Sequence, residues 1–437
     1  MKCDDYSFDV FHFEEISNGH ALTYVLFGLF YKHNLFERMR IDKEKLFRFL
    51  QAVERGYRAE IPYHNASHAA DVLQTVNCFV MSIQCSLFTA EDLVTLFIAC
   101  ALHDYRHPGV TERFCVDSNH EYSLLYNDIY VLESFHAVAA FQLLLSPDED
   151  MNIFSSWHAS KRHQLRTQII RLILATNLTD HFSFIKAFGV AMNNQSVITE
   201  ENKHFVMQAM IKCADVSNPV KPFHIYAHWV SRILEEFFLQ GDIEKTLGMT
   251  VSRFMDRENP EVPQCQIGFI DFIVFPMYRA VSVISDIFSK QCLPAIEKNR
   301  EIWANTANET TQSERPPVLH RIGTAVSTSA LSLNSKPRRT SNFNSKINPS
   351  DATTGIRSLP STSLPNRIFG EGRTPIYDYS YLYDDAQQKQ KSRPAGLSTS
   401  NLSKFDSRSP VHKFSQSSGK LVTAALAAVA STARQNS

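Results

Sequence analysis

This sequence of 437 residues lacks several features that would place it in a familiar class of protein. It has almost no net charge, since 44 basic residues face 45 acidic ones. No apolar run reaches the roughly 18 residues that a transmembrane helix needs. The start, "MKCDDYSFDV", has neither the basic nor the apolar region of a secretory signal. We therefore expect a cytoplasmic protein.

Cysteine pairs are also missing. The eight cysteines are scattered, and no two of them have the CxxC spacing of a zinc ribbon or a redox site. Several stand inside apolar runs, which is typical of reduced thiols in the core of an intracellular protein. The positions are Cys3, Cys78, Cys85, Cys100, Cys115, Cys213, Cys265 and Cys292.

Glycine is rare before residue 304, and the turn dipeptides that join β-strands are nearly absent there. Apolar residues instead recur at helical spacing in stretches such as "HQLRTQIIRLILAT" and "FHIYAHWVSRILEEFFLQGD". In "TAEDLVTLFIACALHD", Thr89 and Asp92 have the spacing of a capping box, which predicts a helix after Thr89. We predict an all-α domain over residues 1–303.

The composition changes near residue 304. Residues 304–437 are rich in Ser, Thr, Asn and Pro and carry 17 basic and 8 acidic residues, whereas residues 1–303 carry 27 basic and 37 acidic ones. The acidic balance of the domain argues against nucleic acid as its ligand. The tail has too few apolar residues to offset the entropy lost on ordering, so it is predicted to be mostly disordered.

Two short segments of the tail are candidates for interaction. In "RRTS", two arginines precede Ser341, which suits a basophilic kinase, although an ordinary basic tail would contain the same letters. The segment "LVTAALAAVASTA" is a candidate docking helix, and it is too short to span a bilayer.

Three separate segments place His or Asp where an apolar helical stretch begins or ends. In "PYHNASHAADV", His64 and His68 would share one face of a helix. Alone, that pair is more typical of structural histidines. "HDYRHPG" adds His103 and Asp104, and "IKCADVSNPVKP" adds Asp215. Imidazole and carboxylate ligands suit Zn²⁺, and oxygen-rich sites suit Mg²⁺ or Mn²⁺, so the three segments together predict a metal site.

From about residue 8 to 300, the chain resembles the catalytic domain of class I cyclic nucleotide phosphodiesterases. The matching stretches, in order, are "PYHNASHAADV", "HDYRHPG", "LLYNDIYVLES", "LILAT", "KCADVSNPVKP", "EEFFLQGD" and "CQIGFIDFIV". The resemblance implies a compact multi-helix His-Asp (HD) domain fold. It also implies metal-dependent hydrolysis of 3′,5′-cyclic nucleotides to 5′-nucleoside monophosphates, by a water activated between two metals.

The resemblance also implies a set of metal ligands. Asp104 would bridge the first metal, zinc, to a second one, magnesium or manganese. The side chains implied to hold the first metal are His68, His103, Asp104 and Asp215. His107 and Glu133 would lie around the second metal and its water molecules.

Catalytic and base-binding roles follow from the same resemblance. His64 would protonate the leaving 3′ oxygen as a general acid, with Tyr63 and Asn65 helping to position it. Gln266 would bond the edge of the purine, which would lie between Phe269 and Ile233. Without the resemblance, plain core packing would be the better interpretation of Phe269 and Ile233. Asn218 matches members that prefer cyclic AMP, so cyclic AMP is expected over cyclic GMP, with dual specificity as the alternative.

The sequence departs from the family pattern at four positions. Asn177 stands where Asp is usual, Glu112 where many members have Asn, and Ser134 and Phe135 where Asn and His are common. Asn177 has lost a charge near the metal helices, which predicts altered metal affinity in an active enzyme.

Two other functions compete with this one. A different HD-domain hydrolase, acting on nucleoside triphosphates, would need basic residues for the extra phosphates and no purine clamp. A non-catalytic relative would have lost His64 or a metal ligand, and the sequence retains all of them.

Overall fold

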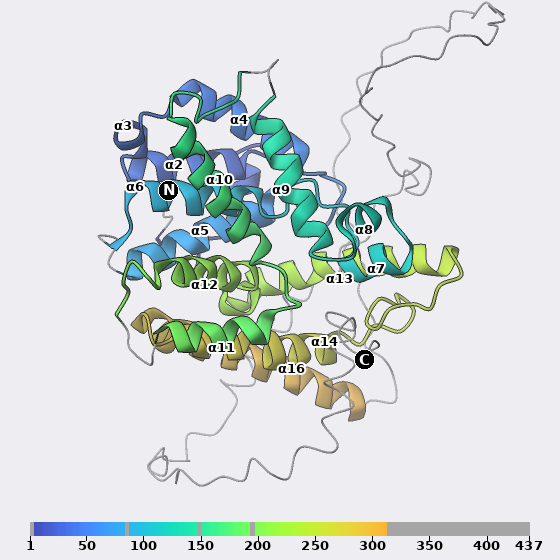
Figure 1. Ribbon diagram of the computed structural model, residues 1–437. Helices are drawn as coiled ribbons and strands as arrows, with labels where there is room; N and C mark the ends of the chain where they lie inside the picture. The colour runs from blue at the N-terminus through green and yellow to red at the C-terminus, as the bar shows by residue number, and fades with distance from the viewer. Residues whose placement is uncertain (1–3, 84–86, 147–149, 193–196, 313–437) are drawn as a thin grey trace, which may run out of the picture. The chain divides into compact units, whose positions relative to one another are not determined.

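The computed structural model describes residues 4–83, 87–146, 150–192 and 197–312 (Figure 1). Every regular element in these ranges is a helix, which confirms the predicted all-α fold class. The elements are α1 (Val10–Ile16), α2 (Ala21–Lys32), α3 (Leu35–Met39), α4 (Lys43–Gly56), α5 (Ala66–Ser82), α6 (Ala90–Leu102), α7 (Glu112–Asp117), α8 (Glu121–Tyr126), α9 (Val131–Leu144), α10 (Ala159–Leu174), α11 (His181–Met192), α12 (Lys203–Asp215), η2 (Asn218–Val220), α13 (Phe223–Thr246), α14 (Val262–Phe269), η3 (Ile270–Val274), α15 (Phe275–Val281), η4 (Phe288–Cys292) and α16 (Leu293–Gln312).

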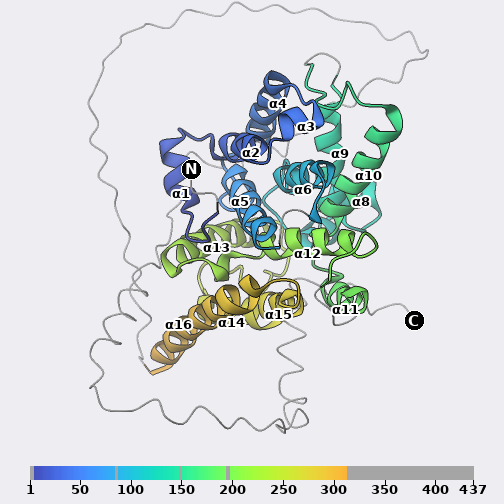
Figure 2. The ribbon, with the colours of Figure 1, turned by 90° about the vertical axis from the view of Figure 1, so that its left-hand side faces the viewer.

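Helix α5 is surrounded by other helices. It contacts α2, α6 and α12, and the two ribbon views show these helices around it (Figures 1 and 2). All of its residues from Ser67 to Val80 are buried. Its buried carboxylate is paired, because the ammonium group of Lys221 donates to Asp71 and to Thr75, each at 2.8 Å. A buried charge needs such partners. The start of α5 is therefore held in a rigid core.

Helix α6 begins as predicted. The Thr89 hydroxyl accepts from the Asp92 amide at 3.1 Å, and the Asp92 carboxylate accepts from the Thr89 amide at 2.9 Å. These two bonds satisfy amide groups that a helix start leaves open. All of α6 except Glu91 is buried, so its end presents His103 from a fixed element.

The predicted helix around His64 is wrong in one respect. Helix α5 begins at Ala66, with Asn65 as its N-cap accepting from the Ser67 and His68 amides. The Asn65 amide group also donates to the Ile61 carbonyl at 2.9 Å, which folds the preceding loop back onto the helix start. His64 therefore lies before the helix and does not share a helical face with His68.

The C-terminal part of the described chain is also helical. Helices α14, η3 and α15 follow one another without a break, and α16 runs past residue 303 to Gln312. Ser341 and the segment 421–433 lie outside the described residues. The six cysteines that the structure describes are buried, and Cys3 and Cys85 lie outside the described residues. None of the described helices combines the length and apolar character that crossing a membrane requires.

Candidate active site

One cavity of about 510 Å³ gathers most of the residues that the sequence singled out. Its wall is built from the loops after α6 and α10 and from helices α9, α12, α13 and α14. His68 and His103 are buried and do not line it. The predicted site residues that do line it are Tyr63, His64, Asp104, His107, Glu133, Asp215, Asn218, Ile233, Gln266 and Phe269.

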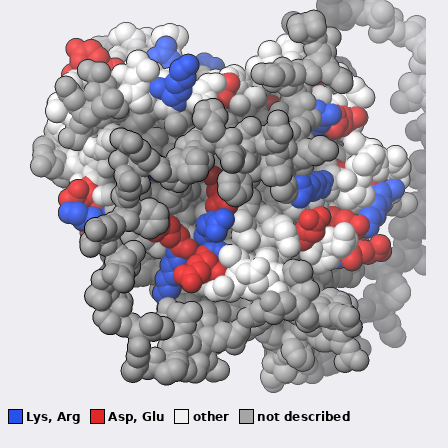
Figure 3. All heavy atoms as spheres, turned by 90° about the horizontal axis from the view of Figure 1, so that it is seen from below, with Lys and Arg blue, Asp and Glu red and all other residues white. Residues whose placement is uncertain are grey.

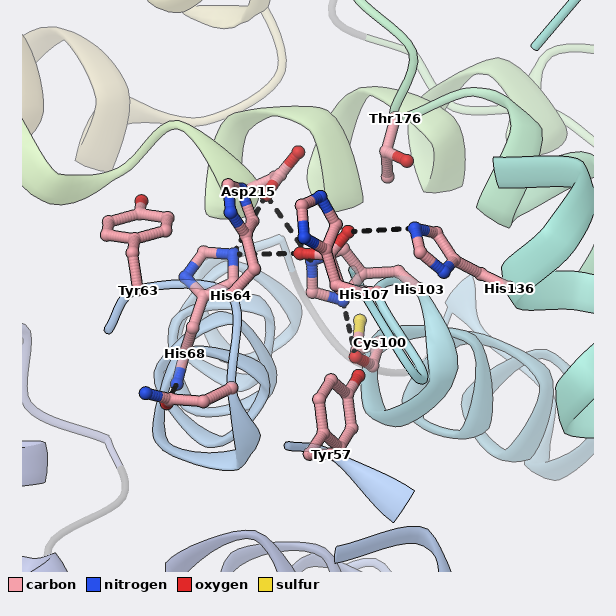
Figure 4. Close-up of polar contacts among 12 residues, drawn as sticks. Tyr57, Tyr63, His64, His68, Cys100, His103, His107, His136, Thr176 and Asp215 are labelled. Atoms are coloured by element: carbon pink, nitrogen blue, oxygen red, sulfur yellow. Dashed lines mark hydrogen bonds and ion pairs between the residues drawn. The ribbon is translucent and has the colours of Figure 1, made fainter. Parts of the chain in front are cut away.

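The four predicted ligands of the first metal meet at one point. The ligand atoms of His68, His103, Asp104 and Asp215 all lie within 4.8 Å of one another. His103 Nε2 is 3.1 Å from Asp104 Oδ2. His68 Nε2 is 3.1 Å from Asp215 Oδ1 (Figure 4). The four come from the first turn of α5, the end of α6 and the end of α12.

The chemistry of this cluster fits a divalent cation. His103 Nδ1 donates to the Cys100 carbonyl at 2.8 Å, so Nε2 carries the free lone pair. His103 Nε2 and Asp104 Oδ2 are buried and make no hydrogen bond within the part of the chain that the structure describes. Ionised, buried and unbonded oxygen atoms are costly unless a cation binds there.

His64 lies next to this cluster and is held by a residue that the sequence analysis missed. His64 Nδ1 is 2.5 Å from Glu236 Oε1. Glu236 Oε2 accepts from the backbone amides of Tyr63 and His64 at 3.0 and 3.1 Å. Although burial opposes it, Glu236 raises the pKa of His64 to about 9. Glu236 belongs to the quoted stretch "EEFFLQGD", yet nothing in that stretch connects it with His64.

His107 stacks on His64 with 4.1 Å between ring centroids. Its Nδ1 accepts from the Gly109 amide at 3.0 Å. Burial and the neighbouring His64 lower the pKa of His107 well below its ordinary value, which favours the neutral ring. His136 was also missed: its Nδ1 donates to the Tyr105 carbonyl at 2.9 Å, and its Nε2 is 3.8 Å from Asp104 Oδ1. The rings of His107 and His136 also stack, with 5.5 Å between their centroids.

The residues expected around a purine also line the cavity. Gln266 and Phe269 both belong to α14, and Ile233 belongs to α13. Phe269 and Ile233 are only half-buried and line the cavity. Gln266 is buried, and its Oε1 is 2.8 Å from the Tyr226 hydroxyl. Asn218 donates to the Tyr63 hydroxyl at 2.6 Å.

The residues that depart from the family pattern take different positions. Asn177 Nδ2 donates to Glu112 Oε2 and to Glu133 Oε2, both at 3.0 Å. Phe135 stacks on Tyr122 with 4.0 Å between ring centroids. The structure therefore links two departures, Glu112 and Asn177, by a direct hydrogen bond.

Comparisons with known proteins point to one family. The model of the family described as 3′5′-cyclic nucleotide phosphodiesterase matches residues 63–295. The probable 3′,5′-cyclic-AMP phosphodiesterase pde-4 of Caenorhabditis elegans is 37% identical over 72% of this chain and 48% of its own length. The human dual specificity calcium/calmodulin-dependent 3′,5′-cyclic nucleotide phosphodiesterase 1B is 37% identical over 68% of this chain and 54% of its own. The chain thus spans about half the length of these curated relatives.

A solved structure has a similar fold. The phosphodiesterase domain of Salpingoeca rosetta rhodopsin phosphodiesterase superposes with a TM-score of 0.66 at 29% sequence identity. The match covers 71% of this chain and 94% of that one.

Proposed function

Because the chain belongs to the 3′5′-cyclic nucleotide phosphodiesterase family, we propose that it hydrolyses the 3′ phosphoester bond of 3′,5′-cyclic nucleotides to give 5′-nucleoside monophosphates. The single observation that carries the proposal is the shared cavity. It joins a candidate cation site, a histidine suited to general acid catalysis and an apolar pocket with amide groups.

The proposed cofactors are two divalent metals. Zinc would be held by His68, His103, Asp104 and Asp215, and magnesium or manganese would share Asp104. Bound there, the two ions would neutralise phosphate oxygens and activate a water molecule for attack on phosphorus. The unbonded Asp104 Oδ2 and the inward-facing His103 Nε2 support this assignment.

His64 would act as the general acid. Its Nδ1 is engaged by Glu236, which leaves Nε2 as the proton donor toward the leaving 3′ oxygen. Glu236 keeps the ring protonated and oriented, because it bonds both the ring and the backbone of His64. The His107 ring stacked on His64 limits its rotation.

We propose cyclic AMP as the preferred nucleotide. Because Asn218 Nδ2 donates to Tyr63, its Oδ1 is the atom left to accept from a base. The 6-amino group of adenine is a donor, whereas guanine carries an acceptor at that position. Gln266, whose Oε1 is occupied by the Tyr226 hydroxyl, is left with its amide donors for an acceptor on the ring. Phe269 and Ile233 would sandwich the purine.

The triphosphate-hydrolase alternative has less support. Among the described residues, the two arginines that line the cavity already face carboxylates. Arg113 is 2.6 Å from Asp117, and Arg253 is 3.8 Å from Glu261. On the face seen in Figure 3, the visible Lys and Arg side chains are scattered among white and red side chains. Extra phosphates would therefore lack free cationic partners.

The test is hydrolysis of cyclic AMP and cyclic GMP, side by side, by the full chain with magnesium, with and without a strong chelator. We expect chelator-sensitive turnover, with a higher kcat/KM for cyclic AMP. His64→Asn should reduce kcat by about 10²-fold or more, the range for a general acid. His163→Asn, an exposed histidine of α10, is the matched control and should leave kcat unchanged. A folded, metal-loaded protein that turns over neither nucleotide would contradict the proposal.

A further inference from the structure

The Glu112 carboxylate joins three helices beside the cavity. Glu112 is the first residue of α7, and its Oε1 accepts from the Val131 amide, the first of α9, at 2.8 Å. Its Oε2 accepts from Asn177, just beyond the end of α10, at 3.0 Å. Tyr130, the N-cap of α9, offers no side-chain cap, so Glu112 supplies the acceptor that this helix start needs.

Asn177 is fixed in four directions. Its Nδ2 donates to Glu112 and to Glu133, and its Oδ1 accepts from the Thr179 amide at 2.7 Å. Its backbone carbonyl accepts from the buried Lys212 ammonium at 2.9 Å. The side chain of Asn177 therefore contacts both glutamates only through its NH₂ group, which donates.

The need for a hydrogen-bond donor explains why Asn occupies position 177 in this chain. A carboxylate at 177 has no donor and would face both Glu112 and Glu133. With Glu at 112, only a donor at 177 satisfies the two glutamates. Many family members have Asn at position 112 and Asp at position 177. In this chain the carboxylate stands at 112 and the amide at 177, so the donor and the acceptor have changed places. The negative charge that Asn177 lacks is therefore retained at Glu112.

We propose that Glu112 is a positioning residue for the metal centre, acting through Asn177 to hold Glu133 in the cavity that Asp104 lines. Glu112, Asn177, Glu133 and Asp104 all line that one cavity. The inference rests on the proposed function, since the two metals give Glu133 its role.

The test is a double-mutant cycle that reverses the polarity of the pair. The variants are Asn177→Asp, Glu112→Gln and the two combined, in which Gln donates and Asp accepts. Glu121→Gln, an exposed glutamate on neighbouring α8, is the matched control. Three quantities are measured on the full chain: the half-saturating Mn²⁺ concentration by calorimetry, the unfolding temperature in chelator, and kcat and KM for cyclic AMP.

We expect each single substitution to raise the half-saturating Mn²⁺ concentration about tenfold, the scale seen when a partner of a metal ligand is lost. The double variant should lose less Mn²⁺ affinity and thermal stability than the two single losses added together, because its Gln amide can donate to its Asp carboxylate and residues in one network are not additive. Losses that simply add in the double variant would overturn the proposal. So would a Glu112→Gln variant that binds Mn²⁺ like the control.

The outcomes also separate this inference from the proposed function. If the wild-type chain turns over no cyclic nucleotide, the proposed function fails, while Mn²⁺ binding and unfolding still decide the pairing. If Asn177→Asp does not fold, a folded double variant is itself the rescue that the proposal requires. An unfolded double variant would refute the proposal.

Discussion

Replacing Glu236 with Gln isolates the charge that holds His64. Gln keeps the size of the side chain and one acceptor for the backbone amides of Tyr63 and His64. It removes the negative charge that lies 2.5 Å from the His64 ring. The change therefore tests electrostatics at His64 with little change in packing.

The structure sets the size of the effect in the metal-free protein. Burial opposes a charged ring, but Glu236 and then Asp104 and Asp215 raise the pKa of His64 from 6.5 to about 9. At 1.36 kcal/mol for each pKa unit, this interval corresponds to about 3 kcal/mol of folding stability. Because the folded pKa is the higher one, that stability is fully present below pH 6.5. It is lost as the pH rises through 9. Glu236 contributes most to raising the pKa of His64. Its replacement should therefore remove about half or more of this pH-dependent stability.

Two assays on chelator-treated protein measure this directly. NMR titration of the His64 ring, assigned with His64→Asn, should show a lower pKa in Glu236→Gln than in the wild type. Chemical denaturation should show a wild-type free energy of unfolding that falls between pH 6 and 9 more steeply than that of the variant. Glu301→Gln, an exposed glutamate on α16, is the control and should match the wild type. An unchanged His64 titration in Glu236→Gln would refute the reasoning.

Three further predictions concern specificity and stability. Asn218→Ala removes the acceptor proposed for the adenine amino group, so kcat/KM for cyclic AMP should fall about tenfold. The kcat/KM for cyclic GMP should stay unchanged, and an equal fall for both nucleotides would contradict the assignment. Gly109 has φ +79°, and an added Cβ would lie 2.5 Å from Ile61 Cδ1, so Gly109→Ala should lower the free energy of unfolding, measured in urea, by about 1–2 kcal/mol. Thr89→Ala breaks the capping box of α6 and should cost about 1 kcal/mol in the same assay, with a wild-type result showing that burial alone holds that helix start.

The cluster of His and Asp side chains proposed to hold the first metal was predictable from the sequence because its signal is local. His103 and Asp104 are adjacent and follow an apolar stretch whose capping box predicts a helix. Asp215 ends a similar stretch. Helix ends are where a rigid backbone can aim a side chain at a fixed point, so residue type and position together indicated the site. The same reasoning misplaced His64, because Asn65 is the N-cap and the helix begins at Ala66, two residues after His64.

The partners of these residues were decided by tertiary structure alone. Glu236 lies 172 residues from His64 in the chain, and no periodicity connects them. Glu112 and Asn177 are 65 residues apart, and each alone looked like the loss of a family feature. Sequence determined which chemical groups this protein carries and which helix ends present them. Only the packing of α7, α9, α10 and α13 around the cavity decided which groups share a proton, a charge or a hydrogen bond, because those interactions depend on distance in space.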